Sequence, residues 1–508
     1  MLERYSTLLL TLVLLTGCKS SGQGRSNVRL STDYTPAVPP SSLTTSDVNR
    51  QAEAPATDKA VIHGEQSGIE QVSATDSTPE LRPISTSEKT SEGISLQQSI
   101  SLALSQNPDL VTLRQSERVS SATLGVAQTY PFNPFVQVQA TPYQDARNSG
   151  QGTTYHYVLL MQTIQLAHQQ QFREQGAAFT LNSTRWNIHQ AELQTLAQTE
   201  RLYFIGLYQR GLMELVEASD RNNQQLLSIM QKQLDAGQAT AADVAIVRVD
   251  AQSTRQQLRL ATVNYQSSLR DLARQAGVSP DFIQAVDGDL RNIEWRLPGV
   301  PEDSIISSDS EIQSAAAEAR SSVLSWAASR PDVMAARSDI DVARANLCLA
   351  SASKTPDLQI GPYYQTTADS THFVGFRGQV DLPVLNNGVP LERQRTAEHH
   401  QRLTAWQQSQ RRAELDAESA LARYEAALTA AATDSSSTVT DLPTELAGLE
   451  NQFRAGEVDV LRVTQARISL IQNQRGRLDL LNEVAQSASA LTGAAGIPVE
   501  QLVRIPEE

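Results

Sequence analysis

The stretch "DAGQATAADVAIVRVDAQ" at residues 235–252 has a counterpart, "RAGEVDVLRVTQARISLI", at residues 454–471. Both contain an alanine–glycine pair, a polar residue three positions after the glycine, and then a run of apolar residues. Gly456 lies 219 residues after Gly237 (456 − 237). We infer that the chain makes the same sharp turn twice.

The residue types at these two turns predict helical hairpins. Gly237 and Gly456 suit the left-handed position that ends a helix. Thr240 and Asp459 suit the N-cap of the helix that follows, and Thr240 with Asp243 approximates a capping box. Taken alone, the motif also fits any helical hairpin of a soluble bundle.

After each turn, residues at alternating steps of three and four form a series that is mainly apolar, with several small or polar members. In the first half these residues are Val244, Val247, Ala251, Thr254, Leu258, Ala261, Tyr265, Ser268 and Leu272. In the second half they are Val463, Ala466, Leu470, Asn473, Arg477, Leu480, Val484, Ser487 and Leu491. This spacing predicts the heptad seam of a coiled coil. A second apolar stripe, which begins at Ile246 and Ile468, predicts helices with neighbours on two sides.

The sequence upstream of each turn also repeats. "SLALSQNPDLVTLRQS" (101–116) corresponds to "LSWAASRPDVMAARSD" (324–339). Two strand-like segments and a long helical stretch follow in each half, and the predicted strands occupy 135–143, 155–166, 358–364 and 373–385. We therefore predict an internally duplicated fold, mainly α with β. Each half runs helix, strand, strand, long helix, turn, long helix.

The predicted strands have one apolar and one polar face. In the clearest strand, Val374 and Phe376 alternate with Arg377 and Gln379, whereas 155–164 alternates poorly. Such alternation is typical of an outer-membrane barrel wall, although a half-buried strand of a soluble sheet is the alternative. Four strands cannot close a barrel, and lipid does not tolerate open sheet edges. If the strands lie in a membrane, several chains must share one barrel.

The N-terminus reads as a targeting signal. An apolar run too short to span a bilayer precedes Leu15-Thr16-Gly17-Cys18, which resembles a bacterial lipobox and implies acylation of Cys18. An ordinary signal peptide with an incidental cysteine is the alternative. Residues 19–93 contain no Phe or Trp, so we expect a disordered tether. The predicted segments are a signal peptide (1–17), a lipidated cysteine with its tether (18–93), a first repeat (94–297), a linker (298–316), a second repeat (317–495) and a C-terminal tail (496–508).

Composition and motifs argue against several classes of function. A net charge of −14 disfavours nucleic acid as a partner, because phosphate binding needs a basic face. The sequence has no phosphate-binding glycine loop, no nucleophile elbow and no convincing metal-ligand spacing, so we expect neither an enzyme nor a bound cofactor. Glu398-His399-His400 is a poor chelate, because adjacent helical residues point about 100° apart. His189 and Glu192 face alike but lack further ligands.

The order of these motifs resembles the TolC-type outer-membrane efflux proteins, over roughly residues 94–495. The resemblance rests on "ALSQNPDL" and "AASRPDV", on the two strand pairs and on the two glycine turns. "LPVLNNGVPLERQRTAEHH" (382–400), which follows the last predicted strand, adds to it. The likeness is strongest to the lipoprotein branch that works with heavy-metal or multidrug tripartite pumps.

The resemblance implies a homotrimer in the outer membrane. Three chains would form one barrel of about twelve strands, continued by a periplasmic tube of helices. It also implies that the turns meet a periplasmic adaptor and that an inner-membrane pump, of the RND type, supplies energy. It places Gly237, Thr240, Asp243, Gly456 and Asp459 at that tip. Where many relatives carry an acidic residue one turn into the second helix, this chain has Arg462, which puts an acidic ring in doubt.

We therefore expect a passive outer-membrane conduit that exports metal ions or small molecules and is gated at its periplasmic tip. Two alternatives remain at the level of sequence. One is a lipid-anchored periplasmic coiled-coil scaffold without a pore, and the other is the outer-membrane channel of a type I protein secretion system.

Overall fold

The structure is a computed structural model. It describes residues 93–143, 153–298, 309–367, 371–436, 448, 452 and 460–504. Cys18, Gly456 and Asp459 lie outside the described residues, as do the signal peptide and nearly all of the tether. The predictions made for them remain predictions.

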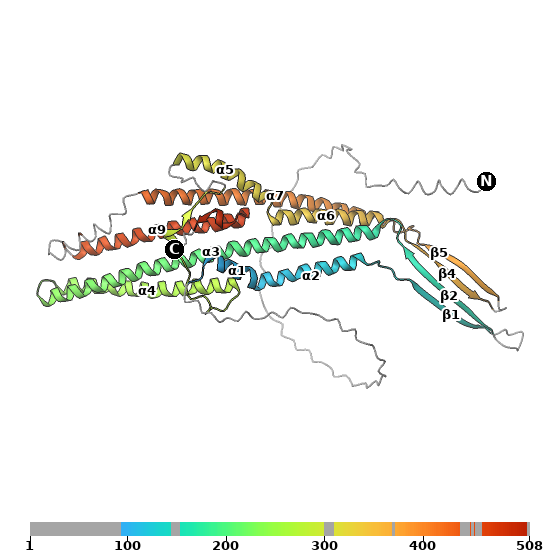
Figure 1. Ribbon diagram of the computed structural model, residues 1–508, viewed down its shortest axis with the longest axis horizontal. Coiled ribbons are helices and arrows are strands. Elements are labelled where there is room, and N and C mark those ends of the chain that lie inside the picture. Colours follow the sequence, from blue (N-terminus) through green and yellow to red (C-terminus); the bar gives the residue numbers. More distant parts are fainter. Residues whose placement is uncertain are drawn as a thin grey trace, which may run out of the picture. The chain divides into compact units, whose positions relative to one another are not determined.

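The described elements follow the same order in both halves of the chain. The first half contains α1 (Leu96–Gln106), α2 (Pro108–Gln128), β1 (Phe135–Tyr143), β2 (Thr153–Ile164), α3 (Gln169–Asp235) and α4 (Ala241–Ala276). The second contains α5 (Asp309–Ala328), α6 (Pro331–Ala352), β4 (Leu358–Thr366), β5 (His372–Val380), α7 (Val389–Ser436) and α9 (Val460–Ala495). Figure 1 shows the four strands at one end of these helices and the α3–α4 turn at the opposite end.

The prediction of a single helix at the start of each half is wrong, because a proline divides that segment into two helices. Pro108 is the first residue of α2, where its missing N–H needs no partner. The Asn107 side chain accepts hydrogen bonds from the backbone N–H groups of Asp109 and Leu110, at 3.0 and 3.1 Å. Pro331 is likewise the first residue of α6, although the residue before it, Arg330, forms no side-chain cap.

The side chain of the residue before each of these prolines also donates a hydrogen bond to a backbone carbonyl near the end of a long helix. The Asn107 amide donates to the carbonyl of Gln275, near the end of α4, at 2.9 Å. The Arg330 guanidinium donates to the carbonyl of Ala494, near the end of α9, at 3.0 Å. Gln275 and Ala494 have the same 219-residue spacing as the two glycine turns. The two halves therefore share this junction as well as their element order.

The main core lies where α3, α4, α7 and α9 pack with the short segments that follow α4 and α9. These segments are η1 (Leu290–Asn292), β3 (Glu294–Trp295), η3 (Val499–Gln501) and β6 (Val503–Arg504). Ile497, Leu502 and Val503 are buried in this core, and β6 pairs with β3. The assignment of 496–508 to a tail therefore misses part of the core. The expected linker, 298–316, is also too long, because α5 begins at Asp309.

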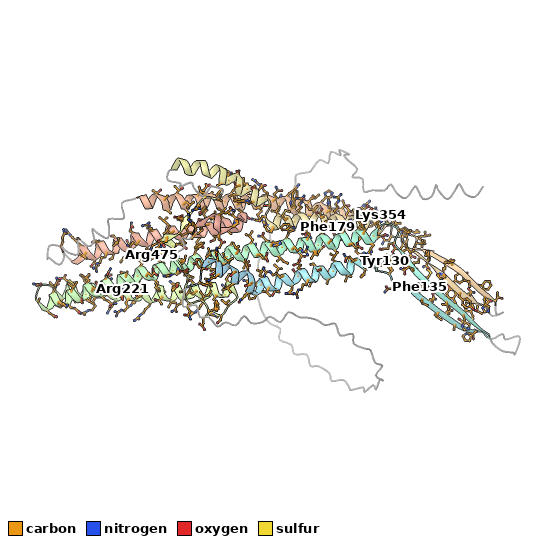
Figure 2. All side chains as sticks on the ribbon, in the orientation of Figure 1. Tyr130, Phe135, Phe179, Arg221, Lys354 and Arg475 are labelled. Atoms are coloured by element: carbon orange, nitrogen blue, oxygen red, sulfur yellow. The ribbon has the colours of Figure 1, made fainter. Side chains whose placement is uncertain are left out.

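The main sheet has the order β1-β2-β4-β5, and all its neighbouring strands are antiparallel. β2 and β4 come from different halves of the chain, so the centre of the sheet joins the two halves. At the junction with the helices, the Tyr130 hydroxyl donates to the carbonyl of Thr163 at 2.9 Å and accepts from the N–H of Gln165 at 3.0 Å. Figure 2 shows Tyr130, Phe135 and Lys354 near this junction.

Candidate functional site: the sheet faces and the helical tip

The register of the sheet divides its residues into two faces, because directly paired residues of neighbouring strands share a face. One face is largely apolar and includes Val136, Val138, Val158, Leu160, Ile164, Leu358, Ile360, Pro362, Tyr364, Val374, Phe376 and Val380. Its side chains are open to the surroundings: Phe376 is 87% exposed and Val374 is 82% exposed. The predicted separation of Val374 and Phe376 from Arg377 and Gln379 is confirmed.

The opposite face is rich in amides and hydroxyls. It carries Gln137, Gln139, Thr141, Tyr155, Tyr157, Thr163, Gln359, Tyr363, Gln365, Arg377 and Gln379. The register also explains the poor alternation of β2. Leu159 and Met161 point to this polar face but are each only 2% exposed, so they are buried apolar residues on a polar surface.

The last strand is shorter than the sequence pattern predicts. β5 ends at Val380, so Leu382 lies beyond it and is exposed. Pro383 has no N–H to donate to a strand ladder, and it restricts the residue before it. The predicted extension of this strand to residue 385 is therefore wrong.

Both outer edges of the described sheet are unpaired, because β1 and β5 each have a strand on one side only. An unpaired edge carries N–H and C=O groups that need partners wherever water is excluded. This sheet could therefore lie in lipid only if another chain paired with each edge.

At the other end of the helices, Gly237 forms the predicted left-handed cap, with φ of 74°. The N–H of Gly237 donates to the carbonyl of Leu234 at 2.9 Å, and the N–H of Gln238 donates to the carbonyl of Gln233 at 2.8 Å. These two bonds constitute a Schellman motif, which satisfies the last carbonyls of α3. No atom lies within 4 Å of where a Gly237 Cβ would be. The backbone conformation, and not crowding, therefore favours glycine at this position.

The predicted capping box at the start of α4 is confirmed. The Asp243 N–H donates to the Thr240 hydroxyl oxygen at 3.2 Å, and the Thr240 N–H donates to the Asp243 carboxylate at 3.0 Å. The Thr240 hydroxyl also donates to that carboxylate at 2.6 Å. These bonds, the one from the hydroxyl first, lower the pKa of Asp243.

Removal of this cap gives a first testable prediction. Thr240→Ala should speed hydrogen exchange of the Asp243 and Val244 amides about fivefold, because an N-cap hydroxyl contributes about 1 kcal/mol. Because the pKa of Asp243 is lowered in the fold, its ionised carboxylate stabilises the cap fully at pH values above the ordinary pKa of aspartate. This stabilisation is lost as the pH falls through the lowered pKa. The protection factors of these amides, which remove the intrinsic pH dependence of exchange, should therefore depend less on pH in the Thr240→Ala variant. Thr240→Ser is the control, and equal exchange in all three proteins would contradict the cap.

The predicted seam of α4 is buried along most of its length: Val244, Val247, Ala251, Thr254, Tyr265, Ser268 and Leu272 are all inside. Near the tip, Val244 and Val247 pack with Leu226 and Met230 of α3 and with Val463 of α9. The second half follows the prediction only in part, since Asn473 and Arg477 are exposed.

The second apolar stripe of α4 has no cover within the described chain. Ile246, Val249, Leu260 and Val263 are all exposed, and Val249 is 67% exposed. The matching stripe of α9 is partly covered: Leu478 is buried and lies against α3 at Gly211. Of the two predicted sides of α4, only the side that carries the seam is therefore covered within the described residues.

The seam also contains a polar group that the sequence pattern does not reveal. The Asn223 amide of α3 donates to the Asp250 carboxylate and to the Thr254 hydroxyl of α4, both at 2.9 Å. Burial raises the pKa of Asp250. Asn223 and Asp250 are 27 residues apart in sequence, so the contact depends on how the hairpin folds.

The remaining sequence candidates do not converge on a site. Arg462 is exposed in the first turn of α9. The imidazole of His189 lies 3.0 Å from the Glu192 carboxylate, which is also paired with Arg114 at 2.7 Å. Glu398 pairs with Arg395 at 2.7 Å. Within the described residues, no group of three or more His, Cys, Asp or Glu side chains could hold a metal ion. No described helix combines the length and the apolar character needed to cross a bilayer.

Comparison with known proteins agrees with this arrangement. Residues 99–278 match the family described as "Outer membrane efflux protein". This stretch runs from within α1 to just beyond α4. No curated protein shows a significant sequence match to the chain.

Solved structures share the fold over most of the chain. CusC is 17% identical, covers 79% of this chain and 91% of its own, and gives a TM-score of 0.60. VceC of Vibrio cholerae is 16% identical, with coverages of 79% and 96% and a TM-score of 0.60. The CmeC outer membrane channel of Campylobacter jejuni is 13% identical, with coverages of 79% and 85% and a TM-score of 0.60. The resemblance to TolC-type efflux proteins is therefore confirmed, and the matched family is one of efflux proteins and not of enzymes.

Proposed function

We propose that this chain, whose residues 99–278 match the outer membrane efflux protein family, is the outer-membrane channel of a tripartite efflux system. Three copies would join their sheets edge to edge into one barrel and their helices into a periplasmic tube. The observation that carries this proposal is the sheet itself. It exposes a broad apolar face, has a polar face behind it, and leaves both of its edges unpaired. A lipid-facing wall with a wet interior needs the first two features, and a wall that several chains share needs edges free to pair with those of other chains.

The helices support the same assembly. The exposed stripe Ile246, Val249, Leu260 and Val263 gives α4 an apolar side that a neighbouring copy can cover. The internal duplication predicted from sequence is supported by the repeated element order and the repeated helix-end junction. An acylated Cys18 would anchor each copy in the outer membrane, and the tube would extend into the periplasm.

In this proposal the chain is passive. Energy comes from an inner-membrane pump of the RND type, and a periplasmic adaptor docks at the tip formed by the two glycine turns. Gly237, Thr240 and Asp243 supply one turn, and Gly456, Asp459 and the nearby Arg462 supply the other. The cargo is a small solute, either a metal ion or a small molecule.

Conductance in planar bilayers tests the proposal. The purified full-length protein should form stable channels of uniform conductance. A membrane-anchored assembly that never conducts would contradict the channel and would favour a coiled-coil scaffold. Secretion of a folded protein substrate that depends on this chain would instead favour a type I secretion channel.

The adaptor role gives a second prediction. Gly237→Val should disturb the tip turn, because a β-branched residue is a strong outlier at positive φ. A photo-crosslinking residue at exposed Gln238 should capture a periplasmic adaptor, identified by mass spectrometry, in the wild-type protein but at least about fivefold less in this variant. Gly237→Asn is the matched control, because asparagine tolerates this conformation.

Both variants should still assemble as heat-modifiable oligomers, because the turn lies far from the sheet. Equal crosslinking of the adaptor in Gly237→Val and Gly237→Asn would show that docking does not depend on the conformation of this turn. A wild-type protein that captures no adaptor from position 238 would show that the first turn is not the docking tip.

A further inference from the structure

The four strands of the main sheet contain a single residue with a permanent charge, Arg377. β1, β2, β4 and β5 have no Asp, Glu or Lys, although the whole chain has 56 acidic and 42 basic residues. The sheet is therefore electrically unlike the rest of this acidic protein, and its charge is positive.

Arg377 lies on the polar face of the sheet. It pairs with Gly361 of β4, which has no side chain, so the guanidinium can extend along the sheet without a competing group opposite it. Its Nη1 donates to the Tyr157 hydroxyl at 3.3 Å, and the rings of Tyr157 and Tyr363 lie 6.0 Å apart. The arginine and the two tyrosines thus gather on one patch of this face.

The guanidinium is exposed and unneutralised within the described structure. Among the described residues no carboxylate forms an ion pair with Arg377, and Tyr157 is its one hydrogen-bond acceptor. A guanidinium has five N–H donors, so most of them remain available to a solute. Among the described residues, the carboxylates that follow or precede these strands lie at the helical end, at Asp357 and Asp381, and Asp357 interacts with Arg173. Asp145 and Asp369, in the loops at the other end of the strands, lie outside the described residues.

The neighbouring side chains on this face are neutral. Gln137, Gln139, Gln359, Gln365 and Gln379 supply amides, which bind water and solutes without selecting the sign of their charge. The sign of the field at this wall therefore depends on Arg377. Arginine recognises carboxylate, phosphate and sulfonate groups with its planar fork, and aromatic rings beside it add an apolar contact surface.

We propose that Arg377, with Tyr157 and Tyr363, is an anion-recognising position on the inner wall of the channel. It favours passage of anionic solutes, aromatic anions in particular, over free metal cations. This inference rests on the proposed channel function and narrows its substrate class.

The test is the reversal potential of the full-length protein in a planar bilayer under a potassium chloride gradient. Arg377→Gln should lower the chloride-to-potassium permeability ratio roughly threefold at about 10 mM salt, where the Debye length is about 30 Å. The difference should shrink at about 1 M salt, where the Debye length is about 3 Å. Gln379→Arg adds a second cation on the same strand and face, and should raise the ratio.

A probe of the aromatic preference is 1,5-naphthalenedisulfonate, which should block the wild-type channel at several-fold lower concentration than it blocks Arg377→Gln. If the channels conduct but both variants keep the wild-type ratio and the same block, the inference is overturned and the conduit stands. If Arg377→Gln fails to assemble, Arg377→Lys replaces it, since lysine keeps the charge without the planar fork. It should keep the permeability ratio but need a several-fold higher concentration of the disulfonate for block, and wild-type block in this variant would overturn the inference. A wild-type protein that never conducts overturns the conduit and this inference together.

Discussion

Phe376→Arg is expected to abolish assembly of the protein in the outer membrane. Phe376 lies in the middle of β5, pairs with Pro362 and exposes nearly all of its ring on the apolar face. An arginine facing lipid near the bilayer midplane costs about 2–4 kcal/mol per chain. In an assembly of identical copies each chain carries this cost, so the assembled fraction should fall roughly 30-fold or more.

Gln379→Arg is the matched control, because it places the same side chain on the same strand but on the polar face. The heat-modifiable oligomer in outer-membrane fractions, resolved by gel electrophoresis, is the measurement. Phe376→Leu should assemble normally, since it keeps an apolar side chain. If Phe376→Arg and Gln379→Arg assemble equally well, the apolar face does not meet lipid.

The second large effect is expected at Gly277, which ends α4. Gly277 has φ of 71°, and a Cβ there would lie 2.2 Å from the carbonyl oxygen of Gln106. Alanine in the left-handed region costs about 1–2 kcal/mol, and forcing apart packed backbone costs about 1–3 kcal/mol more. Gly277→Ala should therefore destabilise the protein by roughly 2–5 kcal/mol, because it separates the end of α4 from the α1–α2 junction.

Gly237 offers a control with the same backbone conformation and open space around it. Its φ is 74°, and nothing lies within 4 Å of where its Cβ would be, so Gly237→Ala should cost only the conformational 1–2 kcal/mol or so. Thermal unfolding of the full chain in detergent, followed by circular dichroism, should rank wild type, Gly237→Ala and Gly277→Ala in falling order of Tm. Equal Tm values for the two variants would mean that the contact at Gln106 is not tight.

The sequence predicts those features that depend on residues close together in the chain. The seam from Val244 to Leu272, the left-handed Gly237 and the Thr240–Asp243 box all follow from spacings of a few residues, and all are present. The faces of β5 follow equally from alternation. In each case the pattern lies within one hairpin turn, one helix or one strand.

The features that the sequence patterns do not predict depend on contacts between residues far apart in the chain. The bond from Asn107 to Gln275 joins residues 168 apart, and the bond from Arg330 to Ala494 joins residues 164 apart, so no local pattern marks them. The burial of Leu159 and Met161 depends on the strands and side chains around them. The role of residues 497–503 depends on the pairing of β6 with β3, which are more than two hundred residues apart.

The tip is the part of the candidate site that the structure describes least completely. The first turn is described in full, whereas Gly456 and Asp459 of the second turn lie outside the described residues. Both turns share a sequence pattern, so we expect the geometry of Gly237 to recur at Gly456. Arg462 then places a positive charge one turn into the second helix, opposite in sign to Asp243 in the first.

The central claim is that one chain contains only part of a membrane wall and that identical copies complete it. Native mass spectrometry of the full-length protein, extracted from outer membranes in detergent, tests this claim most directly. The account predicts a complex of three chains that stays intact in detergent and precipitates when detergent is removed. A single chain that remains monomeric in detergent-free buffer would contradict it.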